Sequence, residues 1–317
     1  MRRLRMIFTK PIIAVLALAT ALAQPRDPGV IAFTHAPDGG PPWPFNYVYT
    51  MADDGSKVRA LTRDGHSHSP TWSPDGRRIL FISDSNHRPV ELHVMNADGG
   101  NRHLLRRLEP VIYAAAWSPD GATIAVTCLL EAGDPMRAGL FLMPSNGTGT
   151  PQRLVRNAFT PAWSPDGKRI AYSLESPRGE WAIHVSDVDG THDLELTDRS
   201  RIAGSPAWSP DGTQIAFDEL GGTQISVMAA DGSRKRRITA DPNWSCGHPS
   251  WSPDGKQIVY SCRSASSPCG TVSSVGTVLP ECARRIFAIS STNPKAVPVQ
   301  LGERDGAAPA FAPAQLR

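Results

Sequence analysis

Three histidines have the residue type and the spacing of a metal site. His66 and His68 are two positions apart, so in an extended chain both imidazoles point to the same side of the backbone. His248 lies at the corresponding point of a later sequence repeat. Together with Asp64, these imidazoles could bind a divalent metal ion. The alternative is that the histidines are solvated or hydrogen-bonded within loops, and the sequence leaves both interpretations open.

The cysteines predict disulfide bonds in an oxidising compartment. If Pro253–Gly255 is a three-residue hairpin loop, Trp251 faces Gln257 and Cys246 faces Cys262. Directly opposed residues in antiparallel strands lie at about 4.5–5.5 Å between Cα atoms, within disulfide range. The sequence therefore predicts a Cys246–Cys262 bond.

A second disulfide is predicted between Cys269 and Cys282, which share the insertion Arg263–Arg284. Cys128 ends a predicted strand and is expected to be a buried free thiol. The alternative is a metal site, but the spacings of 16, 7 and 13 residues lack the short paired spacing of zinc sites.

Aromatic residues outside the repeated pattern are candidates for ligand contact, because aromatic side chains often anchor partners at interfaces. They are Trp43, Phe45, Trp181 and Trp244. Ordinary packing is the alternative for each of them. The basic run Arg234–Arg237 is interpreted as a solvated strand edge whose charges discourage strand addition.

The elements that must position these residues follow from a repeat. Trp-Ser-Pro-Asp-Gly occurs five times, at intervals of 45, 46, 45 and 43 residues, and Phe311-Ala312-Pro313 is a degenerate sixth copy. Asp-Gly or Asn-Gly turns recur in register with it. Each copy reads as four short strands joined by hairpins, which is the signature of a propeller blade. The five copies of the pentapeptide begin at Trp72, Trp117, Trp163, Trp208 and Trp251, and we expect these tryptophans to pack between blades.

The two ends of the repeat predict a closed ring. The last copy ends after its first strand, whereas Val30–Thr34 matches a second strand. Pairing of Ala308–Ala312 with Val30–Thr34 would complete one blade and close a six-bladed, all-β propeller of four-stranded antiparallel blades. Closure protects sheet edges that would otherwise invite aggregation.

Alternating strand directions divide the connections between two ends of the ring. The turn end carries the short, uniform Pro-Asp-Gly and Asp-Gly turns. The loop end carries the variable second-to-third-strand connections and the links between blades: Ala36–Asn46, Arg63–Ser69, Ala240–Gly247 and the insertion Arg263–Arg284. Variable loops usually carry function, so we expect binding at the loop end and at the channel mouth that it surrounds.

The first 23 residues read as a secretory signal peptide, with a basic start, an apolar stretch and Ala21-Leu22-Ala23 before the cleavage point. Residues 24–317 then form a single propeller domain that is periplasmic or secreted and does not span a membrane. Without the four basic residues of the leader, 29 basic residues face 30 acidic ones. This balance gives no electrostatic case for nucleic acid, and we expect a monomer.

Trp-Ser-Pro-Asp-Gly followed by a strand such as Lys168–Tyr172, then a turn and Arg236–Thr239, resembles the TolB-type propeller repeat. The resemblance covers nearly all of the mature chain. It does not extend to the N-terminal α/β domain of that family, for which we expect no room because the first blade strand starts near Val30. It implies an interaction module of the cell envelope, with a peptidoglycan-associated lipoprotein as a candidate partner.

Two functions are compatible with the sequence. The first is a non-catalytic, exported propeller that binds an envelope or secreted protein and carries no cofactor. The second is a carbohydrate-active enzyme, a lyase or hydrolase, or a sugar-binding protein with a histidine-containing metal site at the channel mouth. Some lyases that act on oligogalacturonates have similar repeats but seven blades. The Gly-x-Ser-x-Gly and His-Glu-x-x-His motifs of common hydrolases do not occur in the sequence.

Overall fold

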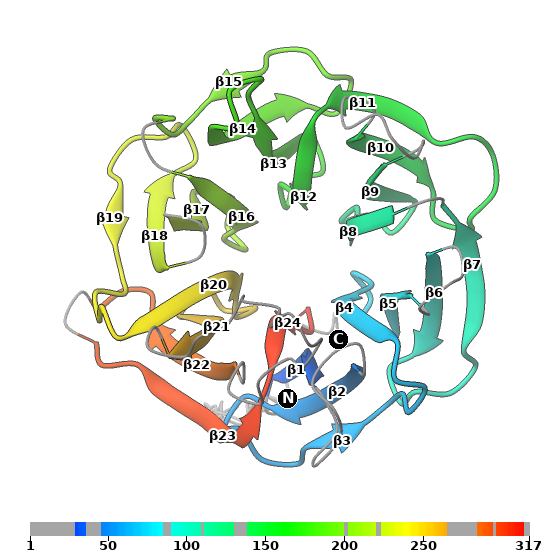
Figure 1. Cartoon of the computed structure of the whole chain (residues 1–317), viewed down its shortest axis with the longest axis horizontal. Coiled ribbons are helices and arrows are strands. Elements are labelled where there is room, and N and C mark those ends of the chain that lie inside the picture. Colours follow the sequence, from blue (N-terminus) through cyan, green and yellow to red (C-terminus); the bar gives the residue numbers. More distant parts are fainter. Residues whose placement is uncertain are drawn as a thin grey trace, which may run out of the picture.

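The protein is an all-β ring in the computed structural model (Figure 1). The structure describes residues 29–35, 46–84, 90–108, 111–129, 138–199, 202–219, 223–264, 284–293 and 296–313. These residues form six four-stranded antiparallel sheets, which we number as blades 1 to 6 from the N-terminus. The predicted fold class is confirmed.

Each blade contributes one strand to each of four concentric positions. The innermost strands are β24 (Ala307–Phe311), β4 (Ser67–Trp72), β8 (Val111–Trp117), β12 (Ala158–Trp163), β16 (Ala203–Trp208) and β20 (Trp244–Trp251). The second strands are β1 (Val30–His35), β5 (Arg78–Ser83), β9 (Thr123–Leu129), β13 (Arg169–Glu175), β17 (Gln214–Glu219) and β21 (Gln257–Ser264).

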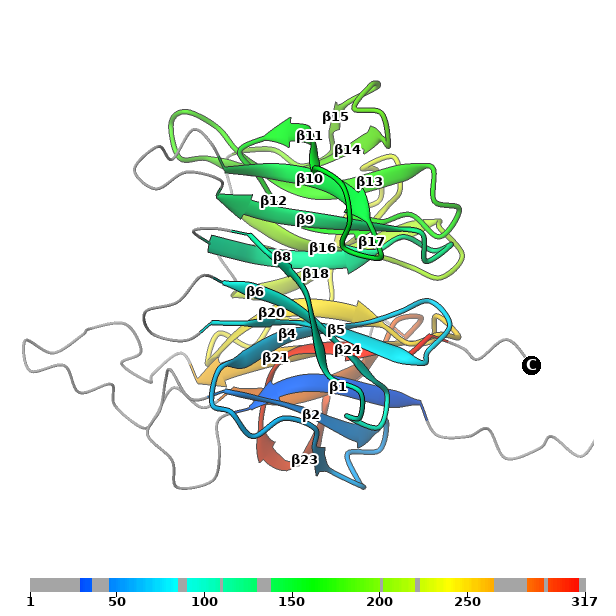
Figure 2. The same cartoon turned by 90° about the vertical axis from the view of Figure 1, so that its right-hand side faces the viewer.

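The third strands are β2 (Tyr47–Ala52), β6 (Glu91–Asn96), β10 (Ala138–Pro144), β14 (Trp181–Asp187), β18 (Gln224–Ala229) and β22 (Arg285–Ser290). The outermost strands are β3 (Arg59–Ala60), β7 (His103–Arg107), β11 (Gln152–Arg156), β15 (Leu194–Glu195), β19 (Arg236–Arg237) and β23 (Val299–Asp305). The side view shows the blades stacked around the ring with their strands running between its two ends (Figure 2).

The ring is closed by strands from the two ends of the chain. β24 lies at the inner edge of the sheet β24-β1-β2-β3, where Ile31 faces Phe311 and Ala32 faces Ala310. The predicted pairing of the terminal strands is therefore confirmed, and Figure 1 shows the red β24 beside the blue β1. Phe311 also packs in a buried cluster between blades 6 and 1.

The repeated serine and aspartate hold every turn between the first two strands of a complete repeat. In blade 4, Ser164 Oγ donates to Asp166 Oδ1 at 2.5 Å and accepts the backbone N–H of Arg169 at 2.9 Å. Gly167 has a φ of 70°, which L side chains rarely adopt. The serine-to-aspartate bond recurs in all five copies at 2.5–2.7 Å. The repeat in the sequence thus encodes a repeated turn.

The repeated tryptophans join neighbouring blades. Trp163 Nε1 donates to the carbonyl of Ala116 on β8, and Trp251 Nε1 donates to that of Ala207 on β16. Trp251 is 6% exposed and belongs to a cluster that includes side chains of both blades 5 and 6. Packing between blades, predicted for these tryptophans, is therefore their role.

Every innermost strand contains a bulge with one extra residue, which the sequence analysis missed. In blade 6, Trp251 faces Ile258 rather than the predicted Gln257, because the turn has four residues and not three. A bulge between Gly247 and Ser250 then shifts the register by one residue in the other direction. Two errors therefore cancel, and Cys246 still faces Cys262.

The basic run lies on and just before the outermost strand of blade 5, where Arg234, Lys235 and Arg237 are exposed, so the predicted solvated edge is confirmed. Lys235 Nζ lies 3.2 Å and Arg237 NH2 3.6 Å from the carboxylate of Glu219, whose side chain is 3% exposed. Arg236 NH2 donates to the carbonyl of Ser291 in blade 6 at 2.6 Å. A buried carboxylate requires such partners, and Arg236 helps to join two blades.

In the described part of the chain, no helix is long and apolar enough to cross a membrane.

Candidate functional site

The bulges of the innermost strands place one residue of each blade at an equivalent position. In four blades this residue has a positive φ and precedes a proline: Ser69 (φ 51°), Thr160 (φ 48°), Ser205 (φ 48°) and His248 (φ 57°). Bulges redirect side chains and are frequent next to functional sites. In blade 3 the unpaired residue of the bulge is instead Tyr113, because Ala114 pairs with Thr127, and the side chain of Ala308 in blade 1 is outside the described residues. Among the four bulge residues with a positive φ, His248 is the one with a titratable side chain.

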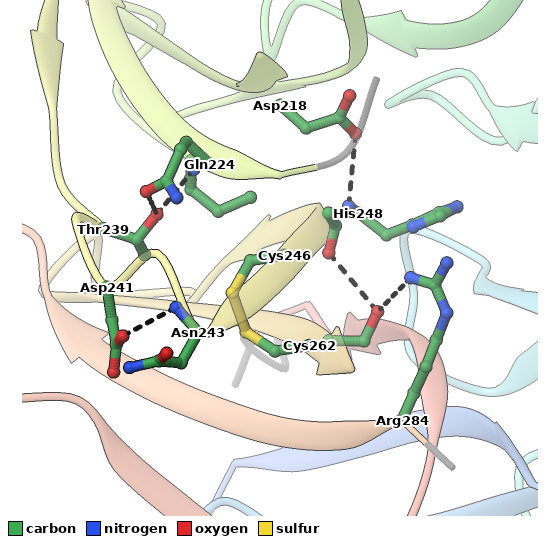
Figure 3. The surroundings of a disulfide bond; sticks show 12 residues. Asp218, Gln224, Thr239, Asp241, Asn243, Cys246, His248, Cys262 and Arg284 are labelled. Atoms are coloured by element: carbon green, nitrogen blue, oxygen red, sulfur yellow. Dashed lines mark hydrogen bonds between the residues drawn. A yellow bond between two sulfur atoms is a disulfide. The ribbon is translucent and has the colours of Figure 1, made fainter. Parts of the chain in front are cut away.

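His248 is acted on by two charged groups, one from β17 and one from the residue directly before β22. Its backbone N–H donates to Asp218 Oδ2 on β17 at 3.4 Å. The side chain is exposed and points away from the neighbouring disulfide, and the guanidinium of Arg284 lies near it (Figure 3). Arg284, directly before β22, donates from NH1 to Ser261 Oγ at 3.5 Å. We refer to Asp218, His248, Ser261 and Arg284 as the axial site.

The electrostatics of the axial site favour a neutral imidazole. Although solvent reaches the His248 side chain, the protein around it on the inside of the ring lowers its pKa by desolvation; Asp218 opposes this change, and the positive charge of Arg284 adds to it. Burial and the neighbouring charge of Arg263 likewise lower the pKa of Arg284, again against Asp218. Because arginine has a very high ordinary pKa, Arg284 remains charged at neutral pH. The site therefore has a fixed cation beside a neutral nitrogen base.

The three histidines proposed as metal ligands lie on two different blades. His68 contacts Ser69 Oγ through Nδ1 at 3.0 Å and Asp84 through Nε2 at 3.5 Å, and the His66 N–H donates to Asp64. Among the described residues, no group of three or more His, Cys, Asp or Glu side chains is close enough to hold a metal ion. The metal site stays a prediction, although a guanidinium beside His248 disfavours a cation there.

Trp244 begins β20 at the loop end and lines a pocket of about 470 Å³ between blades 5 and 6. The pocket is also lined by Ile238, Tyr260 and Phe287, and by both cysteines of the disulfide. The Trp244 ring meets Phe287 edge-on at 5.4 Å between centroids, and the guanidinium of Arg285 lies 5.7 Å from its centre. One face of the indole is thus held by packing within the blade.

The Cys246–Cys262 disulfide predicted from the hairpin is present in the structure, with an S–S distance of 2.09 Å and a Cα–Cα distance of 4.0 Å (Figure 3). Cys128 is a free, fully buried cysteine, as expected, and burial raises the pKa of its thiol to about 12. Cys269 and Cys282 lie outside the described residues, so their bond stays a prediction.

Trp181 belongs to a row of aromatic rings that crosses from blade 3 to blade 4 at the loop end. Its ring centroid lies 4.8 Å from that of Phe159, and Phe159 lies 5.0 Å from Tyr113. Tyr113 is 43% exposed. Trp43 and Phe45, the other two predicted contacts, lie outside the described residues. Among the described residues, the loop end therefore carries an aromatic group around Trp181 and another around Trp244, besides Tyr47 and Tyr49 of blade 1.

Asp218, Arg284 and Tyr113 could not be selected from the sequence, because they come from different blades and no repeat relates them. One signal was available for the bulge itself. Proline occurs two residues before the repeated Trp or Phe in five of the six copies, and proline inside a sheet is confined to edges, strand starts and bulges.

The chain belongs to the TolB beta propeller family, because the family model of the TolB beta propeller domain matches residues 85–277. Over 88 residues it is 35% identical to the uncharacterized peptidase YuxL of Bacillus subtilis, a match that covers 28% of this chain and 13% of that protein. Over 85 residues it is 33% identical to the Tol-Pal system protein TolB of Alcanivorax borkumensis, covering 26% and 19%. The matches thus span under a fifth of these relatives.

The fold is also that of a solved protein. The structure of putative TolB from Agrobacterium tumefaciens superposes with a TM-score of 0.64 at 23% identity, covering 88% of this chain and 90% of that one. At this identity the likeness establishes the propeller architecture and carries no functional residue across.

Proposed function

We propose that this chain is a non-catalytic, exported binding protein that captures an envelope or secreted protein through the loop end of its propeller. The proposal is supported by the family, by the resemblance of the first 23 residues to a signal peptide, and by the contrast between the two ends of the ring. A peptidoglycan-associated lipoprotein is the first partner to test, in line with the Tol-Pal name of one relative.

The observation that carries the proposal is the pair of aromatic groups at the loop end. Trp181 continues a row of rings that ends in the exposed Tyr113, and Trp244 lines a pocket beside a disulfide. Aromatic side chains supply much of the binding energy of protein interfaces. At the turn end, by contrast, the repeated serines and aspartates are engaged in holding turns.

Calorimetric titration of the mature chain with the purified lipoprotein of the same organism tests this function. Truncation of an interface anchor often costs about 2 kcal/mol or more, so Trp181→Ala or Trp244→Ala should weaken binding roughly 30-fold. Trp43→Ala and deletion of residues 264–283 are expected to act in the same direction. Leu194→Ala is the matched control, because Leu194 is 53% exposed but lies on an outermost strand.

The histidine-based alternative predicts the opposite pattern. A carbohydrate-active protein with a metal site would contain a stoichiometric metal by elemental analysis, and His66→Ala or His68→Ala would remove it along with turnover. The binding function predicts that both substitutions leave partner capture unchanged. Two results together would favour the metal-containing function instead: loss of a stoichiometric metal in these variants, and failure of the parent chain to capture any envelope protein.

A further inference from the structure

The guanidinium of Arg284 has more hydrogen-bond donors than the protein uses. Arginine presents five N–H donors. Among the described residues, its hydrogen-bond acceptor is Ser261 Oγ alone, and the distance of 3.5 Å is at the long limit for a hydrogen bond. Ser261 Oγ is itself directed at the carbonyl of Gly247. A half-buried guanidinium with so few protein partners can donate hydrogen bonds to an acceptor from outside the protein.

Within the described part of the chain, a second guanidinium and one carboxylate act on the charge of Arg284. Arg263 lies near enough to lower the pKa of Arg284, so two guanidiniums are close together. Asp218 is the one carboxylate there whose charge acts on both Arg284 and His248. Asp218 is 6% exposed and lies behind the His248 backbone, whose N–H it accepts.

The bulge completes the geometry. With a φ of 57°, His248 departs from regular strand conformation, and its imidazole lies near the Arg284 guanidinium, which approaches it from another direction (Figure 3). A neutral imidazole still carries one N–H donor, and a guanidinium binds a carboxylate through two parallel N–H···O bonds. We propose that the axial site binds one carboxylate group, held by Arg284 with His248 as an additional donor.

This inference does not depend on the partner function proposed above, because the carboxylate could belong to a small molecule or to an acidic peptide. A phosphate, with close to two negative charges at neutral pH, exceeds the single positive charge available. A cation is repelled by Arg284. Charge and donor arrangement together therefore select a monoanion.

Nuclear magnetic resonance of the His248 ring tests the site in the intact chain. The probes are acetate, the peptide acetyl-Ala-Glu-Ala-amide and its uncharged analogue acetyl-Ala-Gln-Ala-amide, at constant pH and ionic strength. The His248 signal is assigned with His248→Gln, and the signal of the exposed His103 on β7 serves as an internal reference. We expect saturable shifts of the His248 signal with acetate and with the Glu peptide, and none with the Gln peptide.

Three variants separate a specific site from general charge effects. Arg284→Gln should weaken binding about tenfold or more, since it removes a charged hydrogen-bonding partner. Arg285→Gln is the matched control: the next residue in the chain has its guanidinium over Trp244 instead, so affinity should stay the same. Asp218→Asn removes the competing negative charge and should strengthen binding. Circular dichroism and an unchanged His103 signal confirm that each variant is folded.

The outcomes are decisive in both directions. Equal binding of acetate and the Glu peptide supports a small-molecule carboxylate site, and much tighter binding of the Glu peptide supports an acidic peptide ligand. The proposal is overturned if neither probe shifts the His248 signal, if inorganic phosphate binds more tightly than acetate, or if Arg284→Gln and Arg285→Gln have equal effects.

Discussion

The two ends of the propeller are built from the same strands but by different means. At the turn end, a serine and an aspartate repeat the same hydrogen bonds in five blades, and the distances agree within 0.2 Å: 2.5 to 2.7 Å. At the loop end, each blade differs, with an aromatic row at blades 3 and 4 and a disulfide, a pocket and the axial site at blades 5 and 6. Uniformity at one end supplies the scaffold that variation at the other requires.

The largest effect is expected from opening the ring, which would disturb the turn end and the loop end together. Deletion of residues 309–317 removes most of β24, so β1 loses its inner neighbour and the Trp72 indole loses the carbonyl of Ala310. We expect a broader thermal unfolding transition and aggregation, because an exposed strand edge is a template for pairing. Calorimetry and light scattering measure both. Deletion of residues 314–317 alone keeps β24 complete and should preserve the sharp transition.

A smaller effect is expected from the disulfide at the loop end. Cys246 and Cys262 are 16 residues apart, and closing a loop of about 15 residues stabilises a protein by roughly 3 kcal/mol in the chain-entropy model. The double substitution Cys246→Ala and Cys262→Ala should lower the free energy of unfolding in urea by up to that amount. A reductant should destabilise the parent chain more than this variant. An effect that remains in the variant would report the predicted Cys269–Cys282 bond.

Two serines with the same kinds of hydrogen-bond partner, a nearby carboxylate and backbone N–H groups, allow the two ends to be compared. Ser164 at the turn end is 1% exposed, with hydrogen bonds of 2.5 and 2.9 Å. Ser176 at the loop end makes bonds of 3.2 to 3.3 Å and is partly exposed. Ser164→Ala should lower the free energy of unfolding by about 1–3 kcal/mol, since it leaves buried groups unsatisfied. Ser176→Ala should cost less. Equal losses in urea denaturation would show that the two ends are not distinguished by turn stability.

The smallest effect concerns acid. Hydrogen bonds from the turn serine, followed by backbone N–H groups, lower the pKa of Asp75, Asp120, Asp166 and Asp211 in the folded chain. A carboxyl with a lowered folded pKa stabilises the protein above its unfolded value, near 3.8, and this contribution is lost as the pH falls through the folded value. The free energy of unfolding should therefore decline below about pH 4. Asp166→Asn should flatten that decline, as measured by urea denaturation at stepped pH.

The sequence predicts the repeated features well because each blade encodes them locally. The Trp-Ser-Pro-Asp-Gly turn, the strand order and the pairing of the terminal strands all follow from one pattern read six times. The hairpin register of blade 6 was wrong near its turn, since the turn has four residues rather than three. The compensating bulge was missed although Pro249 marks it.

The axial site was less predictable for a physical reason. His248 was selected by its position in the repeat, but Asp218 and Arg284 reach it from β17 in the neighbouring blade and from the start of β22. Such lateral contacts depend on how blades pack, which no single period reveals. The polar partners of the basic run Arg234–Arg237 were missed for the same reason, because Glu219 and Ser291 are distant from it in the sequence.

The bulged residue of each innermost strand has a consequence for how this protein can change. Because the extra residue lies between two registers of paired backbone, its side chain can be exchanged without shifting the strand on either side of it. Serine, threonine and histidine all occur there within this one chain. The fold thus has equivalent residue positions on the innermost strands that can vary independently of one another. A side chain with new chemistry can therefore be introduced in one blade while the strand pairing of the propeller stays the same.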